Sequence, residues 1–142
     1  MLKGISPILP PELLKIMMEM GHGDTLVIGD GNFPAAACAK RLVRCDGHSV
    51  VPVLDAVLKL FPLDTTDSKP VRVMQVQDEN APQPAIWAEF RRVISDFEPE
   101  KTELTEIERF AFYEEAKKAY AIVATGETAI YANIILKKGV IA

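Results

Sequence analysis

Four placements of polar residues in this 142-residue chain bring together side chains that could act on a small polar molecule. The first is His22, which lies between Gly21 and Gly23. Glycines let the backbone bend, and histidine titrates near neutral pH, so a ring presented here could pass protons in either direction. The alternative interpretation is an exposed loop histidine without a chemical role.

The second placement is Asp30, which directly follows the apolar run Thr25 to Gly29. That run is typical of a buried strand in a parallel or mixed sheet. Open α/β sheets usually place their ligand sites at the carboxyl ends of such strands, so a carboxylate here could bind a ligand. The alternative is an aspartate that caps a turn or a helix.

The third placement is Arg109, near the start of a helix that we predict over residues 107–118. A step of 100° per residue places Arg109 on an apolar arc of this helix. The arc is formed by Phe112, Tyr113 and Ala116. A guanidinium in such a setting must extend past the apolar side chains to solvent, pair with a carboxylate or hold a ligand.

The fourth placement is the tripeptide Tyr131-Ala132-Asn133, on a strand that we predict over residues 129–136. Residues two apart on a strand point to the same face, so Tyr131 and Asn133 would present a phenol and an amide together. The alternative is a structural pair at the edge of the sheet. Together the four placements supply a neutral acid/base, a carboxylate, a cation, an amide and a phenol, a set suited to a neutral polyhydroxylated ligand.

Several other classes of function find no support in the sequence. No metal-ligand triad, phosphate loop, nucleophile elbow or dinucleotide fingerprint occurs in the context that each requires, so we expect neither a metal ion nor a cofactor. Cys38 and Cys45 have neither zinc-knuckle nor redox-pair spacing, and we expect buried thiols. The chain has 16 basic and 20 acidic residues, with the basic ones scattered, so we expect no nucleic-acid partner.

The sequence also predicts a cytoplasmic protein without a membrane span. The longest apolar run, Ala119 to Ala124, is six residues, against about 20 needed to cross a bilayer. The amino-terminal segment has a single lysine and three prolines where a signal peptide would need a continuous apolar stretch.

The apolar spacing predicts the elements that would position these residues. We expect helices over residues 10–20, 35–40, 53–61, 85–97 and 107–118, and strands over residues 25–29, 41–45, 71–76, 119–124 and 129–136. Alternating helices and strands favour an α/β layer architecture, and this length is enough for one domain, over residues 1–142.

Five segments that span the chain contain these candidate residues. They are Leu2-Lys3-Gly4-Ile5-Ser6-Pro7 with Pro11-Glu12-Leu13-Leu14, Glu19-Met20-Gly21-His22-Gly23-Asp24, Asp30-Gly31-Asn32-Phe33-Pro34, Arg109-Phe110-Ala111-Phe112-Tyr113-Glu114, and Tyr131-Ala132-Asn133-Ile134-Ile135-Leu136-Lys137-Lys138-Gly139. In this order and spacing they resemble the ribose pyranase and L-fucose mutarotase family, and specifically its fucose branch. The resemblance implies a single-domain, three-layer α/β fold with a mixed central sheet and flanking helices.

The resemblance also implies an activity, which is cofactor-free interconversion of the α and β anomers of a free monosaccharide. L-fucose is the first candidate, with ribose and galactose as further ones. His22 matches the catalytic acid/base of the family, Asp30 and Arg109 match substrate-binding positions, and Tyr131, Ala132 and Asn133 match the strand that lines the sugar site. Arginine at position 109 favours the fucose branch, because the ribose branch typically carries histidine there.

Two residues depart from the family pattern within the matching segments. Ala132 stands where glycine is common, which could narrow the pocket. Asn32 stands where some members have histidine, so a second acid/base group at that position is not expected.

A geometric conflict concerns the distance between two of the candidates. If residues 24–30 form a strand that rises about 3.3 Å per residue, His22 and Asp30 lie roughly 20 Å apart, too far to grip one sugar. We therefore expect His22 to face Asp30, Arg109 or the Tyr131 to Asn133 segment of an adjacent chain. The family's ring-shaped homo-oligomers, with sites at subunit contacts, imply the same arrangement, and a ring-based decamer is the expected assembly.

Two further hypotheses use the same residues differently. A non-catalytic sugar-binding or regulatory protein would need the hydroxyl-binding groups but no titrating His22. A structural assembly subunit would leave Arg109 and Asp30 without ligands, and so explains the sequence least well.

Overall fold

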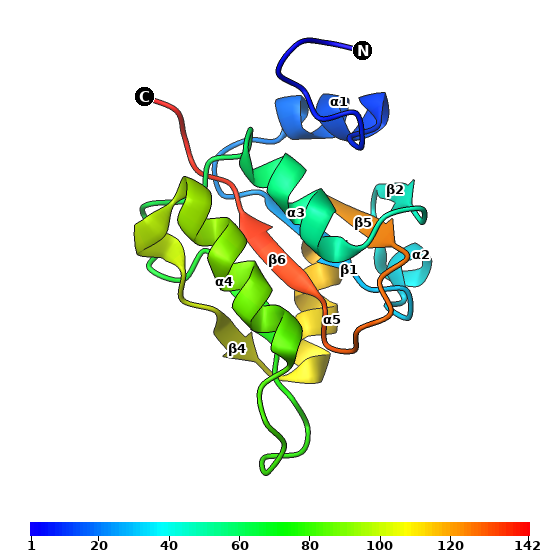
Figure 1. Ribbon diagram of the computed structural model, residues 1–142, viewed down its shortest axis with the longest axis vertical. Helices are drawn as coiled ribbons and strands as arrows, with labels where there is room; N and C mark the ends of the chain where they lie inside the picture. The colour runs from blue at the N-terminus through cyan, green and yellow to red at the C-terminus, as the bar shows by residue number, and fades with distance from the viewer.

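A six-stranded mixed sheet with helices on both faces forms the centre of the computed structural model, which describes residues 1–142 (Figure 1). The strands are β1 (Thr25–Gly29), β2 (Leu42–Cys45), β3 (Val71–Met74), β4 (Thr105–Ile107), β5 (Ala121–Thr125) and β6 (Ile134–Lys137). The helices are α1 (Pro11–Glu19), α2 (Ala35–Cys38), α3 (Val50–Leu58), α4 (Ala85–Phe97) and α5 (Arg109–Lys118), with a short 3₁₀ helix, η1 (Pro99–Lys101).

The order of the strands decides which loops share an edge of the sheet. The order is β2-β5-β1-β6-β3-β4, and β6 runs antiparallel to its neighbours β1 and β3 while the other pairs are parallel. The carboxyl ends of five strands therefore meet the beginning of β6 at one edge, which we call the carboxyl edge. The opposite edge, where β1 and β3 begin and β6 ends, is called the amino edge.

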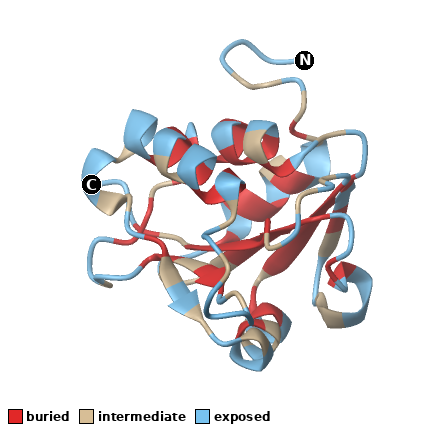
Figure 2. Cartoon of the chain, turned by 60° about the horizontal axis from the view of Figure 1, so that its bottom comes forward, coloured by how far each residue is buried: buried red, intermediate tan, exposed pale blue.

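Two hydrophobic cores, one on each face of the sheet, make the fold three-layered. Leu26 and Ile28 of β1 point into the larger core with side chains from α1, α3 and α4. Val27 points the other way, into a smaller core with residues from α2 and α5. Figure 2 shows the buried strands between these two helical layers. The expected three-layer α/β fold with a mixed central sheet is confirmed.

Agreement with the expected elements is best where burial is most regular. The bounds of β1 and α4 are those predicted from the apolar pattern. Helix α3 begins at Val50, three residues earlier than the apolar spacing indicates, because Pro52 is tolerated in the first turn of a helix. Strand β4 and η1 were not expected, and β4 has no fully buried residue that would mark it.

One expected strand is wrong in its first half. Residues 129–131 form a bend and a turn, residues 132 and 133 have no regular secondary structure, and β6 begins only at Ile134. Tyr131 adopts φ +57°, a left-handed conformation incompatible with a strand. The argument that Tyr131 and Asn133 share a strand face therefore fails.

No helix in the structure combines the length and the apolar character needed to cross a bilayer.

Candidate functional site

A cavity of about 320 Å³ lies at the carboxyl edge, beside the end of β1. Its lining comes from the loop after β1, the end of β3, the first turns of α5 and the turn before β6. The residues are Asp30, Asn32, Phe33, Met74, Arg109, Tyr113, Ile130, Tyr131 and Asn133. The strand order thus brings together four of the expected site residues, Asp30, Arg109, Tyr131 and Asn133.

Asp30 lines this cavity, is buried and is held by its neighbours. Its backbone N–H donates to Oδ1 of Asn133 at 2.8 Å, and its own Oδ1 accepts from the backbone N–H of Asn32 at 2.9 Å. The carboxylate therefore stabilises the loop after β1, as the turn-capping interpretation requires. Its Oδ2 has no hydrogen bond within the chain and is free to accept one from a ligand.

Tyr131 owes its conformation to a residue far away in the sequence. The indole N–H of the fully buried Trp87 donates to the Tyr131 carbonyl at 3.0 Å, and the backbone N–H of Gln77 donates to the phenol oxygen at 3.3 Å. A tyrosine with positive φ is uncommon and needs such support. Although residues 131–133 are not part of a strand, this segment still presents Tyr131 and Asn133 to one cavity.

Ala132 differs from its two neighbours. Its side chain is fully buried in the larger core and does not line the cavity. Any part that this residue takes in binding would therefore use its backbone.

Arg109, the first residue of α5, reaches the cavity with a guanidinium that has no carboxylate partner in the chain. Its guanidinium carbon lies 4.7 Å from the centre of the Phe110 ring. With the Gln77 amide oriented to satisfy both groups, the amide oxygen accepts from Nε of Arg109 at 3.0 Å. Of the three possibilities for this arginine, pairing with a carboxylate is thus excluded within one chain, and the cation remains available to a ligand.

Sequence reasoning missed several members of this site. Phe33, Met74 and Tyr113 give the cavity apolar and aromatic walls, and Gln77 orients Arg109. Phe33 packs edge-on against Phe112 with ring centres 5.7 Å apart, which fixes this wall to α5. The motif Asp30-Gly31-Asn32-Phe33-Pro34 contains Phe33, but nothing in its spacing shows which side chain faces the ligand.

His22 lies at the amino edge and is not part of the cavity. Its side chain is 45% exposed, and Nε2 lies 3.0 Å from Oδ1 of Asp64, whose side chain is only 2% exposed. Strand β1 separates His22 from Asp30, as the strand geometry predicts. Asp64 was not anticipated, because it lies 42 residues away in a polar loop with no distinctive spacing.

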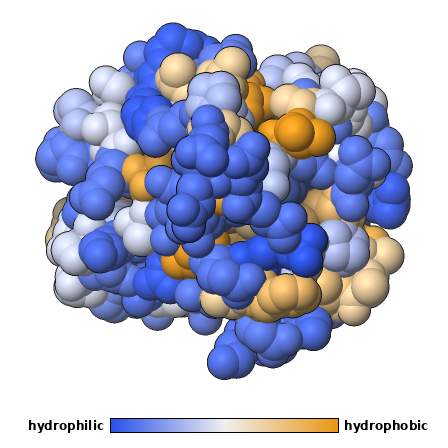
Figure 3. Space-filling model, turned by 90° about the horizontal axis from the view of Figure 1, so that it is seen from below, coloured by the Kyte–Doolittle hydropathy of each residue, from blue (hydrophilic) through white to orange (hydrophobic).

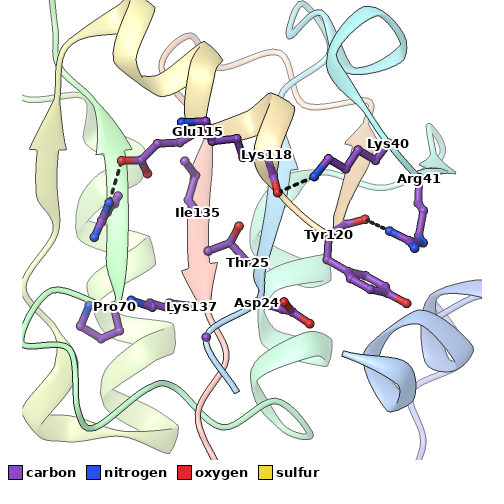
Figure 4. A pocket seen from close by; sticks show the side chains of 12 residues that line it. Asp24, Thr25, Lys40, Arg41, Pro70, Glu115, Lys118, Tyr120, Ile135 and Lys137 are labelled. Carbon is purple, nitrogen blue, oxygen red and sulfur yellow. Dashed lines mark hydrogen bonds and ion pairs between the residues drawn. The ribbon is translucent and has the colours of Figure 1, made fainter. Parts of the chain in front are cut away.

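A second cavity, of about 360 Å³, lies at the amino edge next to the His22 loop (Figure 4). Basic side chains are prominent in its lining, which includes Lys40, Arg41, Arg72, Lys118 and Lys137. Arg72 pairs with Glu115, whereas Lys40 and Arg41 donate to backbone carbonyls. This cavity contains none of the candidate hydroxyl-binding residues.

The surface at the end of the molecule that carries the loop of residues 78–84 is mostly hydrophilic, with apolar side chains in small separate areas (Figure 3). Against this background two apolar residues beside the carboxyl-edge cavity are unusually exposed. Phe110 is 61% exposed and Ile130 is 67% exposed. Contiguous exposed apolar surface is a feature of sites that a ligand or another chain covers.

Comparison with known proteins gives consistent matches over the whole chain. Residues 3–141 match the model of the RbsD / FucU transport protein family. The chain is 46% identical to an L-fucose mutarotase of Histophilus somni over 140 residues, which cover 99% of this chain and 97% of the relative. It is also 46% identical to the human fucose mutarotase over 147 residues, which cover 99% of this chain and 95% of that protein.

A solved structure extends the similarity to three dimensions. The crystal structure of the fucose mutarotase from Streptococcus pneumoniae in complex with L-fucose has a TM-score of 0.94 and 48% sequence identity. The match covers 99% of this chain and 100% of the other.

Proposed function

The chain belongs to the RbsD / FucU transport protein family, and from this premise we propose that it is an isomerase that interconverts the α and β anomers of L-fucose. The observation that carries the proposal is the full-length similarity to a fucose mutarotase whose structure contains L-fucose. Relatives named as mutarotases favour the enzyme over a non-catalytic sugar-binding protein that uses the same pocket. Ribose and galactose are further candidate substrates, and the cytoplasmic location stays a prediction from the sequence.

Mutarotation requires two proton transfers at one end of the sugar ring. The ring opens when the ring oxygen gains a proton and the anomeric hydroxyl loses one, and it closes by the reverse steps after rotation of the aldehyde end. A positioned acid or base typically contributes about 10² to 10⁴ in rate. Proton transfers alone complete the reaction, so the proposal involves no metal ion and no cofactor.

We assign the proton transfer to His22 and the binding of the sugar to the cavity at the carboxyl edge. The free carboxylate oxygen of Asp30 and the amide of Asn133 suit hydroxyl groups, and the unpaired guanidinium of Arg109 can donate to sugar oxygens. A site built to hydrogen-bond hydroxyl groups rejects analogues that lack them. Ala132 links Tyr131 and Asn133 of this cavity through its backbone, while its side chain stays in the larger core.

We further propose that a complete site forms between two copies of the chain. His22 and the cavity lie at opposite edges of the sheet, and apolar residues are exposed at both. Ile130 lines the cavity, while Met18 and Ile141 line an apolar groove with Lys138, whose backbone pairs with that of Gly23 and Asp24 beside His22. A contact in which the amino edge of one copy meets the carboxyl edge of the next is head-to-tail, and such contacts form a ring when the rotation between neighbouring copies closes. The ring-based decamer is the assembly that we propose.

The activity can be measured directly by saturation-transfer NMR between the anomeric proton signals of α- and β-L-fucose. We expect the protein to speed this exchange well above its rate in buffer, with no metal ion or nucleotide added. Treatment with a chelator should leave the rate unchanged. The proposed reaction would be wrong if exchange stayed at the buffer rate, and the cofactor-free mechanism would be wrong if chelation abolished exchange and zinc restored it.

Replacement of Arg109 by alanine tests the assignment of the binding cavity. Hydrogen bonds that involve a charged group contribute roughly 1.5–3 kcal/mol, so we expect the KM for L-fucose to rise about 10- to 100-fold, with a smaller change in kcat. The dependence of the exchange rate on sugar concentration gives both constants. Arg92→Ala is the matched control, because Arg92 is exposed on α4 and pairs only with Asp96. An unchanged KM in Arg109→Ala would remove this arginine from the site.

A further inference from the structure

We propose that Asp64 is a positioning residue for His22: it holds the ring proton on Nε2 and leaves Nδ1 as the nitrogen that exchanges protons with the sugar. The inference rests on the proposed function where it concerns the sugar. The position of the ring proton is a property of the chain alone and can be measured without substrate.

The hydrogen bonds around Asp64 define the direction of the bond to His22. Oδ1 of Asp64 accepts from the backbone N–H and from the hydroxyl of Thr66, both at 2.9 Å, and it lies 3.0 Å from Nε2 of His22. The backbone N–H of Thr66, followed by contributions from His22 and the Thr66 hydroxyl, lowers the pKa of Asp64 well below its ordinary value. An ionised carboxylate can only accept hydrogen bonds, so Nε2 must be the donor.

The hydroxyl of Thr66 leads to the same conclusion. Its hydroxyl oxygen lies 3.4 Å from Nε2 of His22. Since the hydroxyl proton is directed to Asp64, this oxygen also faces Nε2 as an acceptor. Both neighbours of Nε2 therefore require a proton on it, and Nδ1 has no hydrogen-bond partner within the chain.

A single backbone segment holds both side chains in this arrangement. The carbonyl of Lys138 accepts from Gly23 and its N–H donates to Asp24, both at 2.8 Å, which anchors the His22 loop. The carbonyl of Lys137 accepts from the backbone N–H of Asp64 at 2.9 Å. Gly139 allows the close approach, because a Cβ there would lie 2.5 Å from the carbonyl oxygen of Leu63. Backbone hydrogen bonds at the end of β6 thus hold His22 and Asp64 in contact.

The other charged groups near Asp64 pair mainly with partners of their own. Nζ of Lys137 lies 4.0 Å from Oδ2 of Asp64 and 3.0 Å from Oδ2 of Asp67, which also lies 3.4 Å from Arg72. The carboxylate of Asp24, in the His22 loop, instead accepts from the backbone N–H of Gly21 at 2.8 Å. Asp64 is therefore the carboxylate placed to respond when His22 becomes charged.

This arrangement suits the two proton transfers of mutarotation. Neutral His22 takes the proton of the anomeric hydroxyl on Nδ1 while the bond between the anomeric carbon and the ring oxygen breaks and the ring oxygen takes a proton from water. The imidazolium then points its Nε2–H at the Asp64 carboxylate, which stabilises the positive charge. On closure the ring oxygen adds to the carbonyl carbon and returns its proton to the hydroxide that this water became, and Nδ1–H gives its proton to the carbonyl oxygen.

The position of the ring proton can be read by NMR, because His22 and His48 are the only histidines in the chain. In protein labelled with ¹⁵N, two-bond ¹H–¹⁵N spectra at about pH 8.5, where histidine is mostly neutral, distinguish the two tautomers. We expect His22 of the wild-type assembly to carry its proton on Nε2, with His48→Gln giving the assignment. A proton predominantly on Nδ1 would overturn the proposal even if no variant folds.

The variant Asp64→Asn keeps the shape of the side chain and removes its charge. We expect the share of the Nε2–H tautomer to fall, and kcat for L-fucose exchange to fall about 10- to 100-fold with KM within about twofold, as for other residues that orient a functional histidine. Asp46→Asn is the matched control, because Asp46 is exposed and pairs only with Arg44. It should change neither the spectrum of His22 nor kcat.

The outcomes separate this inference from the proposed function. If the Asp64→Asn variant has the same His22 tautomer and the same kcat as the wild-type protein, Asp64 does not position His22. If the wild-type protein shows the Nε2–H tautomer, and Asp64→Asn reduces it, but L-fucose exchange is absent from both, the positioning by Asp64 stands and the proposed reaction is contradicted.

Discussion

Replacement of His22 by alanine is expected to slow L-fucose anomer exchange by about 100-fold or more and to leave the fold intact. The rate should fall because the proposed acid/base group is lost, and a positioned acid or base contributes at least about this factor. The fold should survive because the ring is 45% exposed and its neighbours in the sequence are glycines, so it adds little packing. Saturation-transfer NMR gives the rate, and circular dichroism with size-exclusion chromatography gives the fold and the assembly.

The second histidine of the chain provides the control for this variant. His48 lies in the turn between β2 and α3, is half-buried and forms no side-chain hydrogen bond within the chain. His48→Ala should therefore exchange L-fucose at the wild-type rate. Full activity in a folded and assembled His22→Ala protein would favour the non-catalytic sugar-binding alternative.

The parts of the fold that the sequence predicts well are those whose burial is regular. β1 is buried on both faces, so its sequence Thr25 to Gly29 is an almost unbroken apolar run between polar loops. α4 buries one face, and its apolar residues recur at helical spacing over its whole length. The sequence does not predict β4, because this strand is only three residues long and is the outermost strand of the sheet. Its composition therefore does not differ from that of a loop.

The sequence predicts which residues belong to the candidate site better than it predicts how these residues are arranged. Asp30 could be placed at the carboxyl edge because it follows a buried strand, and His22 at the other edge because strand length fixes the separation. The conformation of Tyr131 could not be inferred, because it depends on a hydrogen bond from Trp87, 44 residues away. The partner of His22 was equally hidden, since Asp64 is brought to it only by the pairing of two loops with the end of β6.

Mixed assemblies of His22→Ala and Arg109→Ala chains are expected to recover activity, because His22 and Arg109 would come from different copies. The sugar concentration is kept well below the raised KM of Arg109→Ala, so that each variant alone exchanges L-fucose slowly. In a head-to-tail ring, a site is intact when its His22 comes from an Arg109→Ala chain and its Arg109 comes from a His22→Ala chain. Random mixing at equal amounts gives this combination at about a quarter of the sites. If both residues served a site within one chain, every site would keep one defect and no mixture would exceed its components.

A mixture of wild type with the double variant His22→Ala/Arg109→Ala provides a second control. In this mixture, sites shared between copies lead to a lower activity than sites within one chain. For sites shared between copies, about a quarter of them would be intact in an equal mixture, whereas about half would be intact if each site belonged to one chain. The two mixtures therefore distinguish the arrangements without reference to the absolute activity. Native mass spectrometry verifies that the chains have mixed.

The most direct measurement is the rate of L-fucose anomer exchange, by saturation-transfer NMR, after His22→Ala and Arg109→Ala assemblies are dissociated, mixed in equal amounts and reassociated. At a sugar concentration well below the KM of Arg109→Ala, we predict recovery to about a quarter of the wild-type rate, well above the sum of the separate variants. Verified mixed assemblies that exchange L-fucose no faster than the two separate variants would contradict a site built from two copies of the chain.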